Sequence, residues 1–327
     1  MKPLALFLLY SIALCAPAQE PATLRLIKTI PLPGVKGRFD HFAIDVKGRR
    51  LFVAALGNNT LEVADAAAGK RLQSITGLHK PTGVVYLPSS DQIGVANGDD
   101  GTLRFYSGTS YSLASTLGSL DDADNLRIDQ KSKLIFLGFG DGALAVIDPA
   151  TMKQTRSIKL SAHPESFQLE PQGNRIFVNV PDAKQVVVLD RTQMTALARW
   201  PMTKFTANFP MALDGANRRL FIGCRQPARL VVFDTANGKS VTDLAISGDT
   251  DDLFYDAKLK RLYLSCGEGF IDVIGQRDAD TYQMRERIST RVGARTSFFS
   301  GDLNEFYLAV PMQGEHQAEI RVFQPQS

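Results

Sequence analysis

A repeat of about 42 residues occurs seven times between Phe39 and Phe323, and it constrains the fold more than any other feature. Each copy contains a short alternating run, a stronger apolar run and a third apolar run, which is typical of β-strands. One register position shows the period, with successive spacings of 42, 42, 41, 44, 42 and 44 residues: Asp45, Leu87, Asp129, Glu170, Asp214, Asp256 and Ser300. A strand-rich repeat of this period predicts an all-β, seven-bladed β-propeller with four-stranded blades.

The two ends of the repeat array indicate how the ring closes. The seventh copy supplies only three strand-like segments before the sequence ends at Ser327, so its blade is one strand short. A further strand-like segment, residues 24–32, precedes the first copy. Because an open sheet edge leaves backbone donors and acceptors unpaired, we expect this segment to form the outermost strand of the last blade.

Residues 1–18 have the features of a secretory signal peptide. Lys2 supplies a basic start, residues 4–15 an apolar stretch and residues 16–18 (Ala-Pro-Ala) a cleavage site. We therefore expect cleavage after Ala18 and a periplasmic or extracellular location. Cys15 raises the alternative of a lipid anchor, but the preceding leucine disfavours it, because lipoprotein sites require a small residue there.

Residues 19–327 are expected to form one propeller domain, since no linker or low-complexity tract interrupts the repeats. This part of the chain contains no apolar run long enough for a transmembrane helix. Without Lys2 the formal net charge of +3 falls to +2, which is too near balance to indicate a nucleic-acid partner. We expect a monomer.

Two cysteines remain in the mature chain, at the same register position of adjacent repeats. Equivalent second strands of neighbouring blades place Cys224 and Cys266 about 10 Å apart by strand spacing. A disulfide needs Cα atoms within about 7 Å. The sequence therefore predicts two separate, half-buried thiols, although export to an oxidising compartment leaves a bridge as the alternative. Neither cysteine lies in a CxxC or CxxCH motif, so haem attachment and thioredoxin-like chemistry have no support.

Repeat units such as RRLFVAALGNNTLEVADAAAGK and NRIFVNVPDAKQVVVLD resemble the YVTN-type repeat of the YncE-like seven-bladed propellers. The longer segments RFDHFAID, DDADNLRID, HPESFQLE, NFPMALD and DTDDLFYD resemble an exported bacterial subgroup of that family. The resemblance covers the whole mature chain. It implies the seven-bladed fold and an envelope location, and it supplies no catalytic residues.

Functional residues are expected where each chain segment leads into the first strand of a blade. In a propeller these lead-in segments lie on one face with the hairpins between second and third strands, around the mouth of the central channel. Aligning the segments RFDH, KPTG, DADN, HPES, ANFP, DTDD and GART gives one ring position: Asp40, Thr82, Asp124, Glu165, Phe209, Asp251 and Arg295. Four carboxylates and one arginine thus share this position.

Carboxylates gathered near one axis repel one another unless a positive charge compensates them. The compensation can come from basic side chains, for which Arg38, Lys80, Arg127 and Arg295 are candidates. It can also come from a bound Ca²⁺ or Mg²⁺, with metal-ligand candidates Asp40, Asp124, Glu165 and Asp251. The alternative is that the acids only bind backbone amides at the strand starts or line a water-filled channel.

Three of the four histidines, His41, His79 and His163, lie at or near the lead-in segments. Imidazole can bind a transition metal or act as an acid or base, but their spacing matches no zinc motif. Arg127 and Gln168 interrupt apolar first strands, so they need polar partners or water.

The predicted ligand-binding set combines the lead-in segments with these polar interruptions: Asp40, His41, Asp124, Asn125, Arg127, His163, Glu165, Asp251, Asp252 and Arg295. The favoured hypothesis is an exported, non-enzymatic propeller that binds a small molecule or a protein on its channel face. The competing hypothesis is a divalent-metal-dependent hydrolase of the lactonase type, which needs a metal-activated water beside an acid or base.

Overall fold

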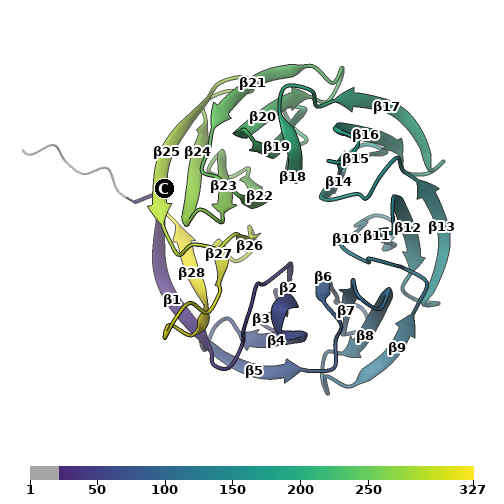
Figure 1. Cartoon of the computed structure of the whole chain (residues 1–327), viewed down its shortest axis with the longest axis vertical. Helices are drawn as coiled ribbons and strands as arrows, with labels where there is room; N and C mark the ends of the chain where they lie inside the picture. Colours follow the sequence, from purple (N-terminus) through teal and green to yellow (C-terminus); the bar gives the residue numbers. More distant parts are fainter. Residues whose placement is uncertain (1–21) are drawn as a thin grey trace, which may run out of the picture.

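The computed structural model describes residues 22–327, which form a ring of seven four-stranded antiparallel sheets (Figure 1). The all-β, seven-bladed fold is therefore confirmed. The predicted signal peptide and its cleavage site lie outside the described residues. No helix of the described part is long and apolar enough to cross a membrane.

The first strand of each blade is the innermost and the fourth is the outermost. Blade one comprises β2 (Phe42–Asp45), β3 (Arg50–Ala55), η1 (Leu56–Asn58, a short 3-10 turn), β4 (Thr60–Asp65) and β5 (Lys70–Ile75). Blade two comprises β6 (Pro81–Leu87), β7 (Gln92–Asn97), β8 (Thr102–Ser107) and β9 (Leu113–Leu117). Blade three comprises β10 (Leu126–Ile128), β11 (Ile135–Phe139), β12 (Ala143–Asp148) and β13 (Lys153–Lys159).

The same order continues around the ring. Blade four comprises β14 (Phe167–Leu169), β15 (Arg175–Val180), β16 (Gln185–Asp190) and β17 (Thr195–Pro201). Blade five comprises β18 (Thr206–Asp214), β19 (Arg219–Gln226), β20 (Ala228–Asp234) and β21 (Ser240–Ala245). Blade six comprises β22 (Thr250–Asp256), β23 (Arg261–Cys266), β24 (Phe270–Gln276) and β25 (Tyr282–Ser289). Blade seven comprises β26 (Thr296–Ser300), β27 (Glu305–Val310), β28 (Ala318–Pro325) and β1 (Leu24–Leu32).

Both faces of each blade are buried, because each blade packs between two neighbours. In β3, Leu51 and Val53 belong to the core shared with blade seven, whereas Phe52 and Ala54 belong to the core shared with blade two. This two-residue alternation explains why the second strands read as continuous apolar runs. A fully buried Leu or Phe side chain contributes roughly 1.5–3 kcal/mol, so the junctions between blades hold most of the stabilising apolar surface.

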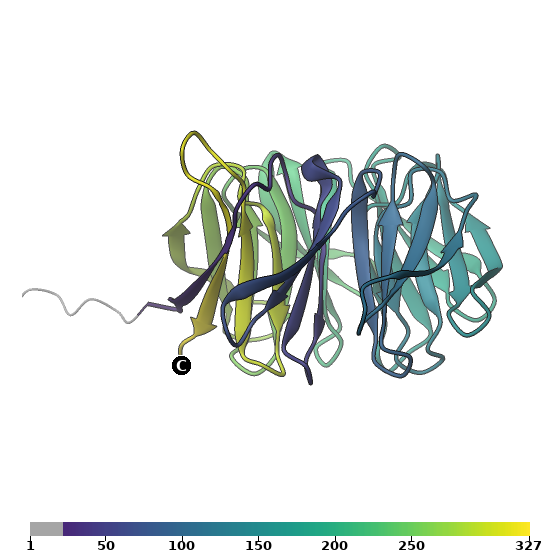
Figure 2. The same cartoon turned by 90° about the horizontal axis from the view of Figure 1, so that it is seen from below.

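The N-terminal strand closes the ring, as predicted. β1 pairs antiparallel with β28 from Leu24 opposite Pro325 to Leu32 opposite Ala318, and Figure 2 shows the two strands side by side. Ile30 and Leu32 are fully buried in the core between blades seven and one. The strand therefore joins the two ends of the chain through both hydrogen bonds and apolar burial.

Arginines bridge neighbouring blades on the face opposite the lead-in segments. Four of them begin a second strand and bond to the next blade: Arg50 to Asp91 and Gly108, Arg175 to Thr235, Arg219 to Asp280, and Arg261 to Gln326. Two more junctions use an arginine elsewhere: Arg191 bonds to Asp129 and Arg49 to Glu305. Within residues 22–327, only the junction of blades two and three lacks such an arginine bridge, and Gln92 begins the second strand there.

Cys224 and Cys266 are separate free thiols, as predicted. The expectation that they are half-buried is wrong, because both side chains are fully buried. They lie in different cores, the first between blades four and five and the second between blades five and six. The second strand packs on both of its faces, so the end of that strand is enclosed as well.

Candidate functional site

Backbone pairing fixes the direction of the side chains in the lead-in segments. The amides of Asp40, Asp124 and Glu165 each donate to a carbonyl on the second strand of their own blade, at 2.8, 2.9 and 3.0 Å. In each case the second strand donates back to the carbonyl of the following residue. This shared pairing turns the same side of each segment toward the ring axis.

The predicted ring position does line a single cavity, which we call the mouth. Its empty volume, which includes space open to solvent, is about 800 Å³, and all seven members of the ring line it: Asp40, Thr82, Asp124, Glu165, Phe209, Asp251 and Arg295. His41, Asn125, His163 and Asp252 from the predicted set also line it. The sequence alignment of the lead-in segments therefore located a cavity lined largely by polar side chains.

Two predicted positions differ. Arg127 lines the channel beneath the mouth and not the mouth itself, because it lies on β10 beyond the lead-in segment. His79 is exposed and does not line the mouth, so two and not three histidines converge there.

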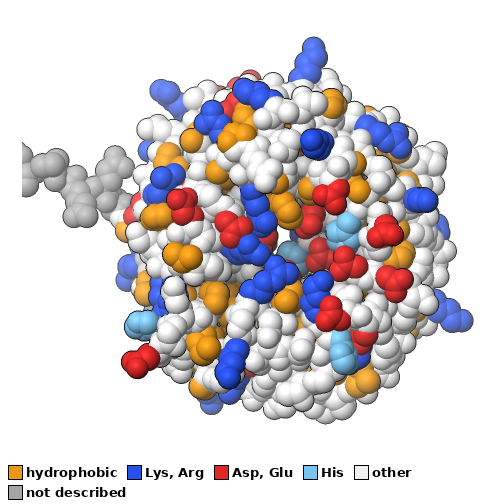
Figure 3. All heavy atoms as spheres, in the orientation of Figure 1, with side chains coloured by type: hydrophobic (Ala, Val, Ile, Leu, Met, Phe, Trp, Pro, Cys, Tyr) orange, Lys and Arg blue, Asp and Glu red, His pale blue; other side chains and the backbone are white. Residues whose placement is uncertain are grey.

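The mouth is electrostatically asymmetric. Figure 3 shows acidic and histidine side chains on the side of blades three and four, and lysine and arginine side chains on the other side of the hollow. The acidic side includes Asp122, Asp124 and Glu165, and the basic side includes Arg225 and Arg295.

The carboxylate of Asp251 is already neutralised by two arginines. Arg225 donates to one of its oxygens, and Arg295 Nε lies 3.1 Å from the other. Arg295 also pairs with Asp249 at 2.7 Å, and the Arg225 guanidinium stacks 3.8 Å from the centre of the Phe209 ring. Arg225 and Asp249 were absent from the predicted set. Arg225 lies near the end of the second strand β19, beside the hairpin on the same face, and aligning those hairpins as well would have found it.

Asp124 is also compensated, in this case by His163. The His163 Nδ1 bonds to the Gly140 carbonyl at 2.7 Å, which leaves Nε2 facing Asp124 at 3.7 Å. Burial alone lowers the histidine pKa, but Asp124, Gly140 and Asp122 outweigh burial and raise the pKa of His163 to about 9. The pKa of Asp124 is lowered, because His163, His41 and Arg38 outweigh the effect of burial. The two residues form an imidazolium–carboxylate pair at neutral pH.

Three carboxyl groups in the mouth lack comparable compensation. Burial, followed by repulsion from other carboxylates, raises the pKa of Asp40 to about 7 and that of Glu165 to about 8. The same causes raise the pKa of Asp252 to about 7. Among residues 22–327, no side chain or backbone donor bonds to the Glu165 carboxylate. The mouth thus holds carboxyl groups that a positive charge would stabilise in their ionised form.

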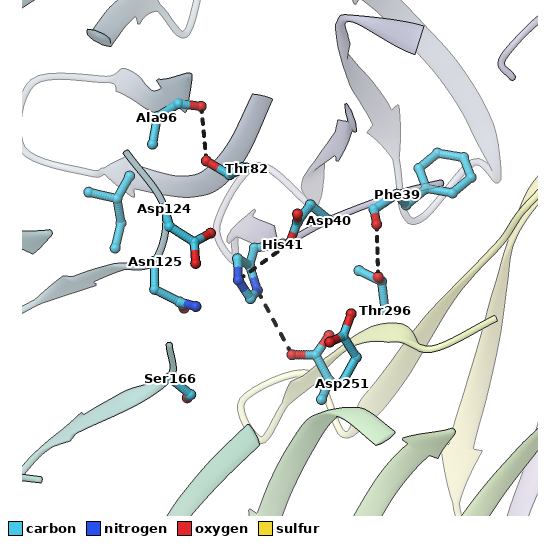
Figure 4. A network of polar contacts seen from close by, with 12 residues as sticks. Phe39, Asp40, His41, Thr82, Ala96, Asp124, Asn125, Ser166, Asp251 and Thr296 are labelled. Carbon is cyan, nitrogen blue, oxygen red and sulfur yellow. Dashed lines mark hydrogen bonds and ion pairs between the residues drawn. The ribbon is translucent and has the colours of Figure 1, made fainter. Parts of the chain in front are cut away.

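Asp40, His41 and Asp124 form the tightest group of potential metal ligands. One ligand atom from each lies within 4.8 Å of the others, and Figure 4 shows the three side chains facing one another. His41 Nε2 lies 3.4 Å from Asp40, and its Nδ1 lies 3.9 Å from Asp252. Two carboxylates and an imidazole suit zinc or manganese, as well as harder ions completed by water. The group includes two of the four predicted metal ligands and omits Glu165 and Asp251.

Comparisons with known proteins support the fold. No protein-family model matches this chain, and no curated protein matches it in sequence. A chain of a structure described as the mitotic checkpoint complex superposes with a TM-score of 0.77 at 14% identity, over 100% of this chain and 99% of that chain. A chain of the Kuenenia stuttgartiensis hydrazine synthase superposes with a TM-score of 0.74 at 16% identity, over 85% of this chain and 95% of that chain. At these identities the similarity shows the β-propeller fold and nothing about the chemistry.

Proposed function

We propose that this chain is an exported, non-catalytic binding propeller of the YVTN-repeat type, which takes a small positively charged ligand in the mouth. The observation that supports this most directly is the presence of three carboxyl groups with raised pKa values, Asp40, Glu165 and Asp252, in one cavity. Asp40 and Asp252 have weak partners, since Arg38 lies 3.7 Å from Asp40 and the Ser297 amide donates to Asp252 at 2.7 Å. The near-neutral composition disfavours nucleic acid as a partner, and we propose that the protein is monomeric.

The ligand contributes a compact positive charge, which either an organic amine or a divalent ion such as Ca²⁺ or Mg²⁺ can supply. Glu165 accepts no hydrogen bond from the described residues and lines the cavity together with Asp124, so it gains most from an added cation. Asp40 and Asp124 approach each other closely enough to share one ion with His41. Asp251 contributes little, because Arg225 and Arg295 already bind it.

The test is the thermal stability of the purified protein at pH 7.5 and constant ionic strength. Ca²⁺, Mg²⁺, Zn²⁺ and spermidine are added separately, with NaCl as the reference. We expect at least one of these cations to raise the Tm of the wild type. We expect Glu165→Gln and Asp40→Asn each to weaken the binding of that cation tenfold or more, which corresponds to about 1.4 kcal/mol. A wild type whose Tm responds to none of these cations would contradict the proposal.

The second candidate is the metal-dependent hydrolase, which is supported by the group of Asp40, His41 and Asp124. In that case the bound ion would activate water, and Glu165 beside it would accept the proton. The distinguishing measurement is hydrolysis of γ-lactones and aryl esters with each divalent ion. Metal-dependent turnover that Asp124→Asn abolishes would favour the hydrolase, whereas cation binding without turnover favours the binding protein.

A further inference from the structure

A second cavity lies in the channel beneath the mouth. It encloses about 1200 Å³, and all seven blades contribute residues to its wall. His41, Ser166 and Asp252 line both cavities, so the two are continuous. The binding of a cation in the mouth does not use this space.

The wall of this lower cavity is largely apolar. Phe254 and Phe298 pack edge to face with ring centres 5.9 Å apart, and the partly exposed Ile44 and Ile128 contribute further apolar surface. Such a surface favours an aromatic or aliphatic body of a ligand, since burying it removes apolar area from water.

Arg127 introduces an unpaired positive charge into this cavity. Its guanidinium donates to Asn125 Oδ1 at 2.9 Å and to the Leu126 carbonyl at 2.7 Å, and it lies 5.5 Å from the centre of the Phe167 ring. Within the described residues, no carboxylate lies at ion-pair distance from it. Burial lowers the pKa of Arg127, while Asp252 and Asp124 oppose this from farther away. A partly enclosed cation without a counter-ion is costly unless a ligand supplies one.

One hydroxyl group beside Arg127 is also poorly satisfied. Ser166 lines the same cavity, and its oxygen accepts only a long contact of 3.5 Å from Arg127 Nη2. Buried polar groups normally have partners, so the Ser166 hydroxyl is a further donor for an anionic ligand.

We propose that the lower cavity is a binding site for a small organic carboxylate with an aromatic or aliphatic body. The carboxylate pairs with Arg127 and Ser166, and the apolar body packs against Phe254, Phe298 and Ile44. This site goes beyond the proposed function, because it recognises a negative charge in a different part of the channel.

An opening on the opposite face offers such a ligand a route that avoids the acidic mouth. A third cavity, of about 1480 Å³, shares Ile44, Tyr86, Ile128 and Gln130 with the lower cavity. It extends between the turns of blades two and three, where Lys133 and Pro149 line it. The third cavity therefore reaches the surface beside the junction that, among the described residues, lacks an arginine bridge.

The test uses phenylacetate as the probe and its neutral amide, phenylacetamide, as the matched control, both titrated into the wild-type protein by calorimetry. We expect phenylacetate to bind at least tenfold more tightly than phenylacetamide, and acetate, which lacks the apolar body, to bind weakly. Equal affinity for phenylacetate and phenylacetamide would overturn the proposal without any variant being made.

Variants then assign the preference to Arg127. We expect Arg127→Gln to remove the tenfold preference and Arg127→Lys, which keeps the charge, to retain part of it. Arg199→Gln makes the same change at an exposed position on β17 and should leave binding unchanged. Glu165→Gln should also leave phenylacetate binding unweakened, which separates this site from the cation site in the mouth. A preference that survives in Arg127→Gln would contradict the assignment.

Discussion

At the scale of single residues, acidic side chains at equivalent positions of the ring differ in how their charge is neutralised. Asp251 is bound by two arginines and Asp124 by an imidazolium, whereas Glu165 has no donor among the described residues. Equivalent repeat positions therefore hold one neutralised carboxylate, one ion pair and one carboxyl group with its pKa raised to about 8. The neighbours that reach each carboxylate decide its chemistry.

Glu165 should make the stability of the empty protein fall as the pH rises. The ordinary pKa of a glutamate side chain is 4.5, whereas the pKa of Glu165 in the folded protein is raised to about 8. The folded state therefore holds the proton more tightly, so stability is fully present below pH 4.5 and is lost as the pH rises toward 8. Glu165→Gln removes this loss. We expect the variant to be more stable than the wild type at pH 8 by on the order of 1 kcal/mol, with a much smaller difference at pH 4.5, by urea unfolding.

The matched control is Glu315→Gln, which makes the same change at an exposed position in blade seven. It should leave the pH dependence unchanged. A Glu165→Gln protein that loses stability equally at both pH values would show that the glutamate has a structural role and that its ionisation is not strained.

The two cysteines should be unreactive in the folded protein and reactive when it unfolds. Burial raises the pKa of both Cys224 and Cys266, so little thiolate forms and no reagent reaches it. We expect no reaction with a thiol reagent under native conditions and two thiols per chain in denaturant without a reductant. Finding no thiol in denaturant would mean that a disulfide forms in the exported protein.

At the scale of elements, the repeat predicted the strands and their closure because both depend on local pattern. The period of about 42 residues and the apolar alternation survive in every copy, and the segment 24–32 matches β1 residue for residue. The pairing of Arg225 with Asp251 could not be predicted in the same way. It depends on which side chain of the neighbouring blade reaches the carboxylate, which no repeat position encodes.

Removing β1 should open the ring. Deletion of residues 22–33 exposes the edge of β28 and removes Ile30 and Leu32 from a buried core. Loss of two such side chains alone costs roughly 3–6 kcal/mol, so we expect a sharp fall in Tm or failure to fold. Adding residues 22–33 back as a separate peptide should raise the Tm of a folded deletion protein. An unchanged Tm after the deletion would show that β1 is not the closing strand.

At the scale of the whole molecule, the ring is as stable as its weakest junction allows, because each blade contacts only its two neighbours. In the part of the chain that the structure describes, six junctions carry an arginine bridge on the face opposite the mouth, and the junction of blades two and three does not. In blade two, Leu87 and Gln92 occupy the positions at which Asp45 and Arg50 form an ion pair in blade one. The unbridged junction is also where the third cavity opens.

Adding the missing bridge should therefore stabilise the ring. In Gln92→Arg, the new guanidinium is positioned to donate to the carbonyl of Pro149, which occupies the place of Gly108 in the bridge made by Arg50. A hydrogen bond from a charged donor contributes about 1.5–3 kcal/mol, part of which is lost in ordering the long side chain, so we expect a gain of about 1 kcal/mol by urea unfolding. The reverse change, Arg50→Gln, should lower stability by about 2 kcal/mol. The new arginine also narrows the opening between blades two and three, so phenylacetate should bind more slowly. A Gln92→Arg protein that is less stable than the wild type would show that this junction is open for a reason other than the missing arginine.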